Sequence, residues 1–333
     1  MNPTLLALIH ILADGEIHSG EELGQAAGVS RAAVWKQLKQ IEKLGISIIS
    51  QKASGYRIPG GLSLLRVDEL LSGLSADASA AIHRVALFDQ LDSTNGWLLK
   101  RIAEGEPRGL VCLAEQQTAG RGRRGRVWVS PFAANLYLSV GWRFSQGIAA
   151  LEGLSLAVGI AVCDGLQTLG YPQVRLKWPN DLLVADRKLG GILVEIAGDA
   201  SGECAVVIGL GLNVRMPSSS QSEIDQPWTD LASLSAGAVP DRNGLVTAVL
   251  DQLMPMLDAY EDRGFGYYRE RWESMAAHLG SEVVIQSPSS EVAGTLLGVT
   301  DSGGLRLQVE GGERIFLGGE VSLRAGHRDQ YGR

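Results

Sequence analysis

The sequence has few cysteines, little charge and no long apolar run. Its three cysteines (Cys112, Cys163 and Cys204) are widely spaced, which excludes a disulfide framework and a cysteine-based zinc site. The apolar stretches, such as residues 154–162, are interrupted by polar residues and glycine and are too short to span a bilayer. The N-terminus lacks a signal-peptide pattern. We therefore expect a protein of the reducing cytoplasm that binds no membrane.

Familiar catalytic motifs are also missing. The chain has no Walker A sequence, no Gly-x-Ser-x-Gly elbow and no His-Glu-x-x-His motif. The histidines are scattered through the chain, at His10, His18, His83, His278 and His327. We expect each of them to have a structural role or to be exposed. Any chemistry should therefore depend on charge stabilisation and not on a histidine base.

The composition is that of a globular chain with more than one domain. Of its 333 residues, 45% are hydrophobic and 20% are charged, which excludes a disordered or fibrous protein. The length predicts two or three domains. The net charge of −7 argues against unspecific binding of nucleic acid by the whole surface. It does not exclude a local basic patch.

Residues 1–62 have the pattern of a separate domain. Three short helices are predicted, the second beginning with a Ser19–Glu22 capping box and the third capped by Ser30. Two short strand-like runs follow, and Pro59-Gly60-Gly61 is typical of a linker. Three helices and a hairpin in this order predict a winged helix-turn-helix.

Basic residues are concentrated in this domain. Between Ser30 and Ile58 there are six basic residues and one acid, Glu42. Together with the predicted turn and wing, this charge favours DNA binding, with the third helix in the major groove and the hairpin on phosphates. A domain that binds another protein is the alternative. The candidate DNA-binding residues are Ser30, Arg31, Trp35, Lys36, Lys39, Lys52 and Arg57.

The rest of the chain mixes strands and helices. Between Arg84 and Gly209, strand-like runs separated by short turns alternate with helices at 94–104 and 149–169, which predicts an α+β domain with a mixed or mainly antiparallel sheet. Helices are expected from about 242 to 277, after a polar loop at 216–227. Short strands over 283–324 predict a small barrel-like domain. We place the domain boundaries at 63–275 and 276–333.

A loop of glycines and arginines carries the clearest chemical signal. Residues 120–126 read Gly-Arg-Gly-Arg-Arg-Gly-Arg and fit the dinucleotide fingerprint G-x-G-x-x-G. That fingerprint needs a helix directly after the glycines, whereas the apolar run 127–129 predicts a strand. Interleaved arginines pair well with phosphate oxygens. We interpret the loop as one that closes over an anionic group, in preference to a basic surface loop.

A second cationic position precedes a proline corner. Lys177 lies at the end of a predicted strand, directly before Trp178-Pro179, and the proline fixes the turn. An ammonium group held there can bind both a carboxylate and a phosphate. Asn180 and Asp181 either hold the turn, which is the more common role, or help to hold a metal ion.

These motifs, in this order, resemble those of the bifunctional biotin–protein ligases that also act as the biotin operon repressor. The resemblance covers nearly the whole chain, including the N-terminal domain. The matching segments are Asp92-Ser93-Thr94-Asn95, residues 117–125, Lys177-Trp178-Pro179-Asn180-Asp181, residues 188–193, residues 209–213 and residues 319–324.

The resemblance implies a central domain like class II aminoacyl-tRNA synthetases and an SH3-like C-terminal domain. It implies catalytic roles for Arg121, Arg123 and Lys177. The residues implied to bind biotin are Ser93, Thr94, Asn95, Gln117, Arg121, Gly122, Arg123 and Lys177. Those implied to bind ATP are Arg123, Arg124, Asn180, Lys188, Asn213 and Trp228, with Trp228 packed on the adenine.

The reaction implied by the resemblance has two steps. The biotin carboxylate attacks the α-phosphate of ATP, and pyrophosphate leaves with Mg²⁺. A lysine of the biotin carboxyl carrier protein of acetyl-CoA carboxylase then attacks biotinyl-AMP. The expected regulator is a homodimer that forms when biotinyl-AMP is bound and binds operator DNA. A lipoate-type protein ligase and a ligand-sensing repressor without catalysis are the alternatives.

Overall fold

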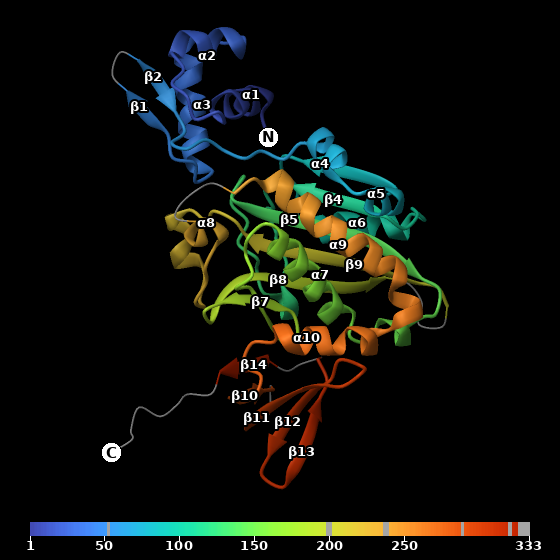
Figure 1. Cartoon of the computed structure of the whole chain (residues 1–333). Coiled ribbons are helices and arrows are strands. Elements are labelled where there is room, and N and C mark those ends of the chain that lie inside the picture. Colours follow the sequence, from blue (N-terminus) through green and yellow to red (C-terminus); the bar gives the residue numbers. More distant parts are fainter. Residues whose placement is uncertain (52–53, 198–201, 236–239, 288–289, 319–321, 326–333) are drawn as a thin grey trace, which may run out of the picture.

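The structure is a computed structural model that describes residues 1–51, 54–197, 202–235, 240–287, 290–318 and 322–325. Three parts follow one another in space (Figure 1). The N-terminal helices lie at one end, a large sheet with its helices forms the middle, and a small sheet lies at the other end.

The N-terminal part confirms the predicted helix-turn-helix and its wing. Ser19 Oγ accepts a hydrogen bond from the Glu22 amide, and the Glu22 carboxylate accepts one from the Ser19 amide, so the predicted capping box is present. The elements are α1 (Pro3–Leu12), α2 (Gly20–Ala26), α3 (Arg31–Lys43) and an antiparallel hairpin of β1 (Ile49–Gln51) and β2 (Gly55–Arg57).

The core of this N-terminal part is shared with the central part. Its apolar cluster is built from α1, α2 and α3, and it also contains Phe132 and Ala133 of the central part. Phe132 is only 4% exposed. Leu62 and Leu64 of the following linker pack against the same cluster. The linker therefore lies against both parts.

Removing the N-terminal part tests the proposed boundary at residue 62. We expect a chain that begins at Leu62 to fold and to keep the biotin adenylation that the resemblance implies, while losing the DNA binding predicted for residues 1–62. Its melting temperature should fall, because Phe132 loses the apolar cluster that now buries it. Thermal melts of the truncated chain with and without Phe132→Ser measure this effect. Complete loss of cooperative melting in both chains would contradict the boundary.

The central part is one seven-stranded mixed sheet in the order β3-β4-β5-β9-β8-β7-β6. Only β3 and β4 run parallel; the other neighbours are antiparallel. This confirms the mixed sheet expected from the sequence. The strands are β3 (Arg84–Phe88), β4 (Leu110–Ala114), β5 (Asn135–Phe144), β6 (Arg175–Lys177), β7 (Asp181–Val184), β8 (Arg187–Ala197) and β9 (Cys204–Asn213).

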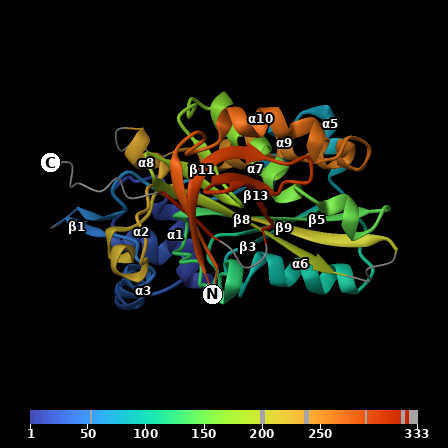
Figure 2. The same cartoon turned by 90° about the horizontal axis from the view of Figure 1, so that it is seen from below.

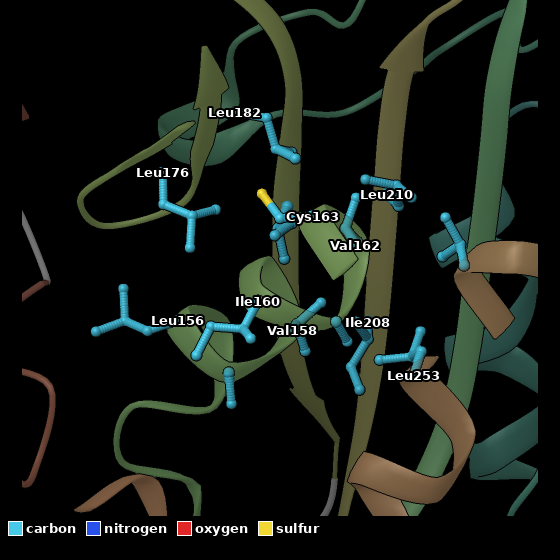
Figure 3. Packing of buried hydrophobic residues seen from close by; sticks show 14 of the residues in the cluster. Leu156, Val158, Ile160, Val162, Cys163, Leu176, Leu182, Ile208, Leu210 and Leu253 are labelled. Atoms are coloured by element: carbon cyan, nitrogen blue, oxygen red, sulfur yellow. The ribbon is translucent and has the colours of Figure 1, made fainter. Parts of the chain in front are cut away.

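Helices cover both faces of this sheet (Figure 2). One face carries α7 and α9, and the opposite face carries α6. Side chains of α7 are buried nearly all round, because the helix lies between the sheet and α9. Val158 and Val162 face Ile208 and Leu210 of β9 (Figure 3). The helices are α4 (Val67–Gly73), α5 (Ala76–Ala81), α6 (Thr94–Ala103), α7 (Leu154–Thr168), α8 (Leu231–Leu234), α9 (Arg242–Arg263) and α10 (Arg269–Met275).

Three local expectations need correction. The predicted helix 149–169 is two elements, a 3₁₀ turn η2 (Ile148–Leu151) and α7, separated at Gly153, which has φ +72°. The strand predicted at 127–129 is wrong, since Val127 forms only an isolated bridge with Arg121. The helical region before residue 277 contains the 3₁₀ turn η4 (Phe265–Tyr268) between α9 and α10.

The C-terminal part is a five-stranded antiparallel sheet in the order β13-β12-β11-β10-β14. The predicted barrel closure stays a prediction. Its strands are β10 (Glu282–Gln286), β11 (Glu291–Val299), β12 (Leu305–Val309), β13 (Gly312–Phe316) and β14 (Ser322–Ala325). Across all described residues, no helix has the length and apolar character needed to cross a bilayer.

Candidate active site

A cavity of about 420 Å³ opens beside α6, with its walls formed by β5, β8, β9 and the glycine–arginine loop. It gathers segments that lie far apart in the sequence. Every residue that the sequence analysis assigned to biotin or ATP lines it: Ser93, Thr94, Asn95, Gln117, Arg121, Gly122, Arg123, Arg124, Lys177, Asn180, Lys188, Asn213 and Trp228.

The start of α6 supplies a buried polar wall. Ser93 caps this helix by accepting a hydrogen bond from the Gly96 amide. Thr94 lies beside Gln117, whose Oε1 accepts from the Thr94 amide at 2.9 Å. Ser93, Thr94 and Asn95 are each no more than 5% exposed. Hydroxyl and amide groups held in this way suit a neutral polar ligand.

The glycine–arginine loop contributes cations from another side. It contains the short 3₁₀ turn η1 (Arg123–Gly125), in which Arg124 has φ +59°. Arg121 pairs with Glu195 at 2.9 Å. Arg123 donates to Asn180 Oδ1 at 3.1 Å and to the carbonyl of Gly318 from the C-terminal part. Burial lowers the pKa of the Arg123 guanidinium, and the charge of Arg124 lowers this pKa further, whereas Asp181 raises it.

The corner after Lys177 is held from several directions. Trp178 is 2% exposed and donates from Nε1 to the Gly303 carbonyl. Asn180 donates from Nδ2 to the Ile192 carbonyl at 2.7 Å while it accepts from Arg123. These contacts support the turn-holding role of Asn180. Lys177 is thereby placed at the end of β6, at the wall of the cavity.

Lys188 lies at the centre of the part of the cavity that the sequence analysis assigned to ATP. This lysine pairs with Asp181 at 2.7 Å and lies 5.6 Å above the Trp128 ring. Asn213 Nδ2 donates to the Thr229 carbonyl at 3.1 Å, and Trp228 forms a bridge with Lys188. The polar segment before Trp228 is a 3₁₀ turn, η3 (Ser218–Glu223), followed by residues 224–227 that belong to no helix or strand.

Sequence reasoning missed several residues of this region. Trp128 packs on Gly211, where an added Cβ would lie 2.4 Å from the ring, so only glycine fits there. Ser130, Ser139 and Glu195 hydrogen-bond the residues that line the cavity. No motif marks Ser139 and Glu195, because they reach the site through the register of β5 and β8, whereas Trp128 and Ser130 lie outside the strands.

The sequence left metal binding by Asn180 and Asp181 open and predicted no catalytic histidine. Within the described ranges, no group of three His, Cys, Asp or Glu side chains is arranged to hold a metal ion. His278 lies 3.6 Å from Asp186. Burial lowers the pKa of its imidazole, Asp186 raises this pKa, and Lys177 lowers it.

The predicted DNA-binding residues of α3 are on its surface. Trp35 is 55% exposed, and Lys39 pairs with Glu42 at 2.7 Å. Arg57 in the wing is half-buried, whereas Lys52 lies outside the described residues. The exposed members on and before α3 are Ser30, Arg31, Trp35, Lys36 and Lys39.

Comparison with known proteins agrees with this arrangement. Three family models match in order: an HTH domain at 4–57, the biotin/lipoate A/B protein ligase family at 87–213 and a biotin protein ligase C-terminal domain at 278–324. The bifunctional ligase/repressor BirA of Escherichia coli is 41% identical over 98% of this chain and 99% of its own length. The chain belongs to the family of bifunctional biotin ligase/repressors.

Other members and structures are consistent with this family. The BirA protein of Bacillus subtilis is 30% identical over 93% of the chain and 95% of its own length. Among solved structures, the biotin protein ligase from Aquifex aeolicus in complex with biotin and ATP is 28% identical with a TM-score of 0.65. It covers 74% of this ligase/repressor and 100% of the Aquifex chain.

Proposed function

We propose that this ligase/repressor activates biotin with ATP and transfers it to a lysine of a biotin carboxyl carrier protein. The observation that carries this function is a cavity in which a neutral polar wall meets six cationic side chains, among them Arg121, Arg123 and Lys177. The wall of Ser93, Thr94 and Gln117 suits the ureido ring of biotin. The cations suit its carboxylate and the phosphates of ATP.

The proposed roles follow from the positions of these groups. Lys177 binds the biotin carboxylate and the α-phosphate, so that negative charge moving from one to the other stays paired. Arg121 and Arg123 hold the phosphate, with Gly122 between them at the loop backbone. Asn95, which also lines the cavity, is assigned to biotin together with this polar wall. The nucleotide contacts are assigned to Arg124, Asn180, Lys188, Asn213 and Trp228.

Two displacements make up the proposed reaction. A biotin carboxylate oxygen bonds to the α-phosphorus as the bond to pyrophosphate breaks, which leaves biotinyl-AMP. The neutral amine of the acceptor lysine then bonds to the biotinyl carbonyl carbon, and AMP leaves. Alignment within a closed cavity supplies much of the rate and keeps water from the mixed anhydride.

Mg²⁺ is proposed to enter with ATP. This ion prefers oxygen ligands and is usually held by phosphates and waters together with one or two carboxylates. The carboxylates of Asp181, Glu223 and Asp225 line the cavity and fit that preference. When bound, the ion would neutralise charge on the leaving pyrophosphate.

Isotope exchange between pyrophosphate and ATP tests the enzymatic proposal. We expect exchange that depends on biotin and does not occur with lipoate. Exchange with lipoate alone would assign the chain to the lipoate-type ligases. If neither acid supports exchange, the chain is a ligand-sensing repressor without catalysis.

The N-terminal part is proposed to bind operator DNA in the cytoplasm. The exposed basic surface of α3, next to the wing, supports this role. A single helix-turn-helix reads a short half-site, so two copies are expected on a symmetric operator. The proposed regulator is therefore a homodimer.

Self-association is expected to use the free part of β8. β7 pairs with β8 as far as Gly191, and the amide and carbonyl of Ile192 still bond to Asn180, so the predicted edge at 191–196 begins after Ile192. Among the described residues, those from 193 to 196 have β9 as their only neighbouring strand, and Ile196 is 48% exposed. A free strand edge is a template for pairing with a second copy.

Biotinyl-AMP should favour this dimer. We expect sedimentation to show a shift from monomer to dimer when the adenylate is added, because ordering of the loops at 121–126 and 216–227 gives the dimer a higher affinity for it. Unbiotinylated acceptor should reverse the shift. A monomer–dimer equilibrium that does not respond to the adenylate would exclude this coupling.

A further inference from the structure

The outer surface of α3 carries one large apolar side chain, Trp35. The core face of this helix is formed by Val34, Leu38 and Ile41, and Trp35 lies outside it. Trp35 is 55% exposed, and no other large apolar side chain among the described residues of the N-terminal part is more exposed. An indole left in water gives up the free energy that its burial would contribute. The ring is thus available to a binding partner.

The neighbours of Trp35 along the helix make their contacts elsewhere. Arg31 and Lys39 lie one turn before and one turn after Trp35 on the same side of α3. Arg31 packs along α2, where an added Cβ on Gly20 would lie 3.3 Å from its Nε. Lys39 pairs with Glu42 at 2.7 Å. No aromatic ring or cationic group of the described residues stacks on the Trp35 ring, so its face is open.

The backbone that carries Trp35 is held in place at the start of α3. Ser30 caps the helix, since its Oγ accepts a hydrogen bond from the Ala33 amide at 3.3 Å. The turn before the cap is tight, because an added Cβ on Gly24 would lie 2.8 Å from the Val29 carbonyl oxygen. A tryptophan has only two side-chain torsions, so it loses less conformational freedom on binding than a lysine does. A rigid ring on a fixed helix suits a contact that selects its partner.

The charges around Trp35 favour DNA as this partner. Arg31 and Lys36 are exposed on the same helix and are suited to bind phosphates on either side of the major groove. In that groove all four bases present hydrogen-bonding groups, but only thymine also presents an apolar group, its C5 methyl. The open indole ring therefore has one chemically matched partner on the base edges.

We infer that Trp35 is a specificity-determining residue whose ring packs on the C5 methyl of a thymine in each half-site of the operator. This inference rests on the proposed DNA binding and extends it to the base that is read. The cations of α3 supply affinity that does not depend on sequence, whereas Trp35 discriminates thymine from the other bases. Two copies on a symmetric operator make this contact twice.

Replacement of thymine by uracil tests the contact, because uracil lacks only the methyl group. The probe is a DNA duplex that the full chain, with biotin and ATP, selects from a pool of random sequences. Its affinity is measured by fluorescence anisotropy. At one position of a half-site, uracil should weaken binding by the wild type about 4-fold, the effect of losing one methyl-sized apolar contact. Replacement at the symmetric positions of both half-sites should weaken it about 16-fold, since distant contacts are additive.

Two substitutions of Trp35 separate the contact from a merely structural role. Trp35→Ala should bind the thymine duplex and the doubly replaced uracil duplex with affinities within about 2-fold of each other. Trp35→Phe keeps an aromatic ring at the same place and should still bind the uracil duplex at least about 4-fold more weakly. Damage to the fold of α3 would lower both affinities together and would appear in a thermal melt.

Lys36→Ala is the matched control on the neighbouring residue. Loss of a phosphate contact should weaken binding of both duplexes by the same factor and leave the 16-fold ratio in place. If no uracil replacement weakens the wild type, or if folded Trp35→Ala keeps the 16-fold ratio, the inference is wrong although operator binding stands. If the wild type selects no sequence from the pool, the proposed operator binding fails, and the inference fails with it.

Discussion

Lys177→Ala is expected to slow biotin-dependent pyrophosphate exchange by at least ~10²-fold, the order of loss when one charge donor to a transition state is removed. Lys177 lies at the end of β6, before a corner fixed by Trp178 and Asn180. Because the Lys177 ammonium group is already held in place, it can stabilise the negative charge that develops in the transition state without a change in its own position. The loss should appear mainly in kcat, since the interaction is strongest in the transition state.

Arg175→Ala is the control for this substitution. Arg175 lies in the same strand and is exposed, and it donates to the Pro172 and Val174 carbonyls outside the cavity. Its loss should leave exchange close to the wild-type rate. Near-normal exchange by a folded Lys177→Ala variant would show that a group other than Lys177 stabilises the negative charge of the transition state.

Arg242→Ala is expected to lower the free energy of unfolding by about 3–5 kcal/mol, because it leaves a buried carboxylate without its partner. Arg242 is 1% exposed, and its guanidinium pairs with Glu115 at 2.5 Å. The same group donates to the carbonyls of Asn135 and Ser63. Urea unfolding followed by tryptophan fluorescence gives the change from the midpoint and slope.

The control is Arg108→Ala, which removes an exposed ion pair with Asp258 and a cation–π contact with Trp142 and should cost no more than about 2 kcal/mol. Combining Arg242→Met with Glu115→Leu should recover part of the lost stability, since no charge is then left buried alone. Equal stability of Arg242→Ala and Arg108→Ala would mean that the buried pair contributes nothing.

The features that sequence alone could predict are those that local chemistry determines. The members of the capping box, Ser19 and Glu22, are only three positions apart in the sequence, and the box is present. The residues of the cavity were found because each motif is contiguous. The motifs meet in one cavity because β5, β8 and β9 are neighbours in the sheet.

The features that could not be predicted depend on contacts between distant segments. The apolar run 127–129 predicted a strand, yet Val127 is 79% exposed and the Trp128 ring packs against Gly211. The break before α7 lies at Gly153, which has φ +72°, and Phe265, far along the chain, fills the space where a Cβ on Gly153 would lie. Neither neighbour can be read from the local sequence.

The position of Arg242 late in the chain also determines when the linker can be fixed during translation. The linker residue Ser63 is held by Arg242, which lies 179 positions later. At translation rates of about 5–20 residues per second, roughly 9–36 s separate the appearance of these two residues. The DNA-binding helices therefore leave the ribosome and can fold well before the residue that fixes their linker exists. A nascent chain released early would carry a formed DNA-reading module with no fixed attachment to the ligand-sensing part.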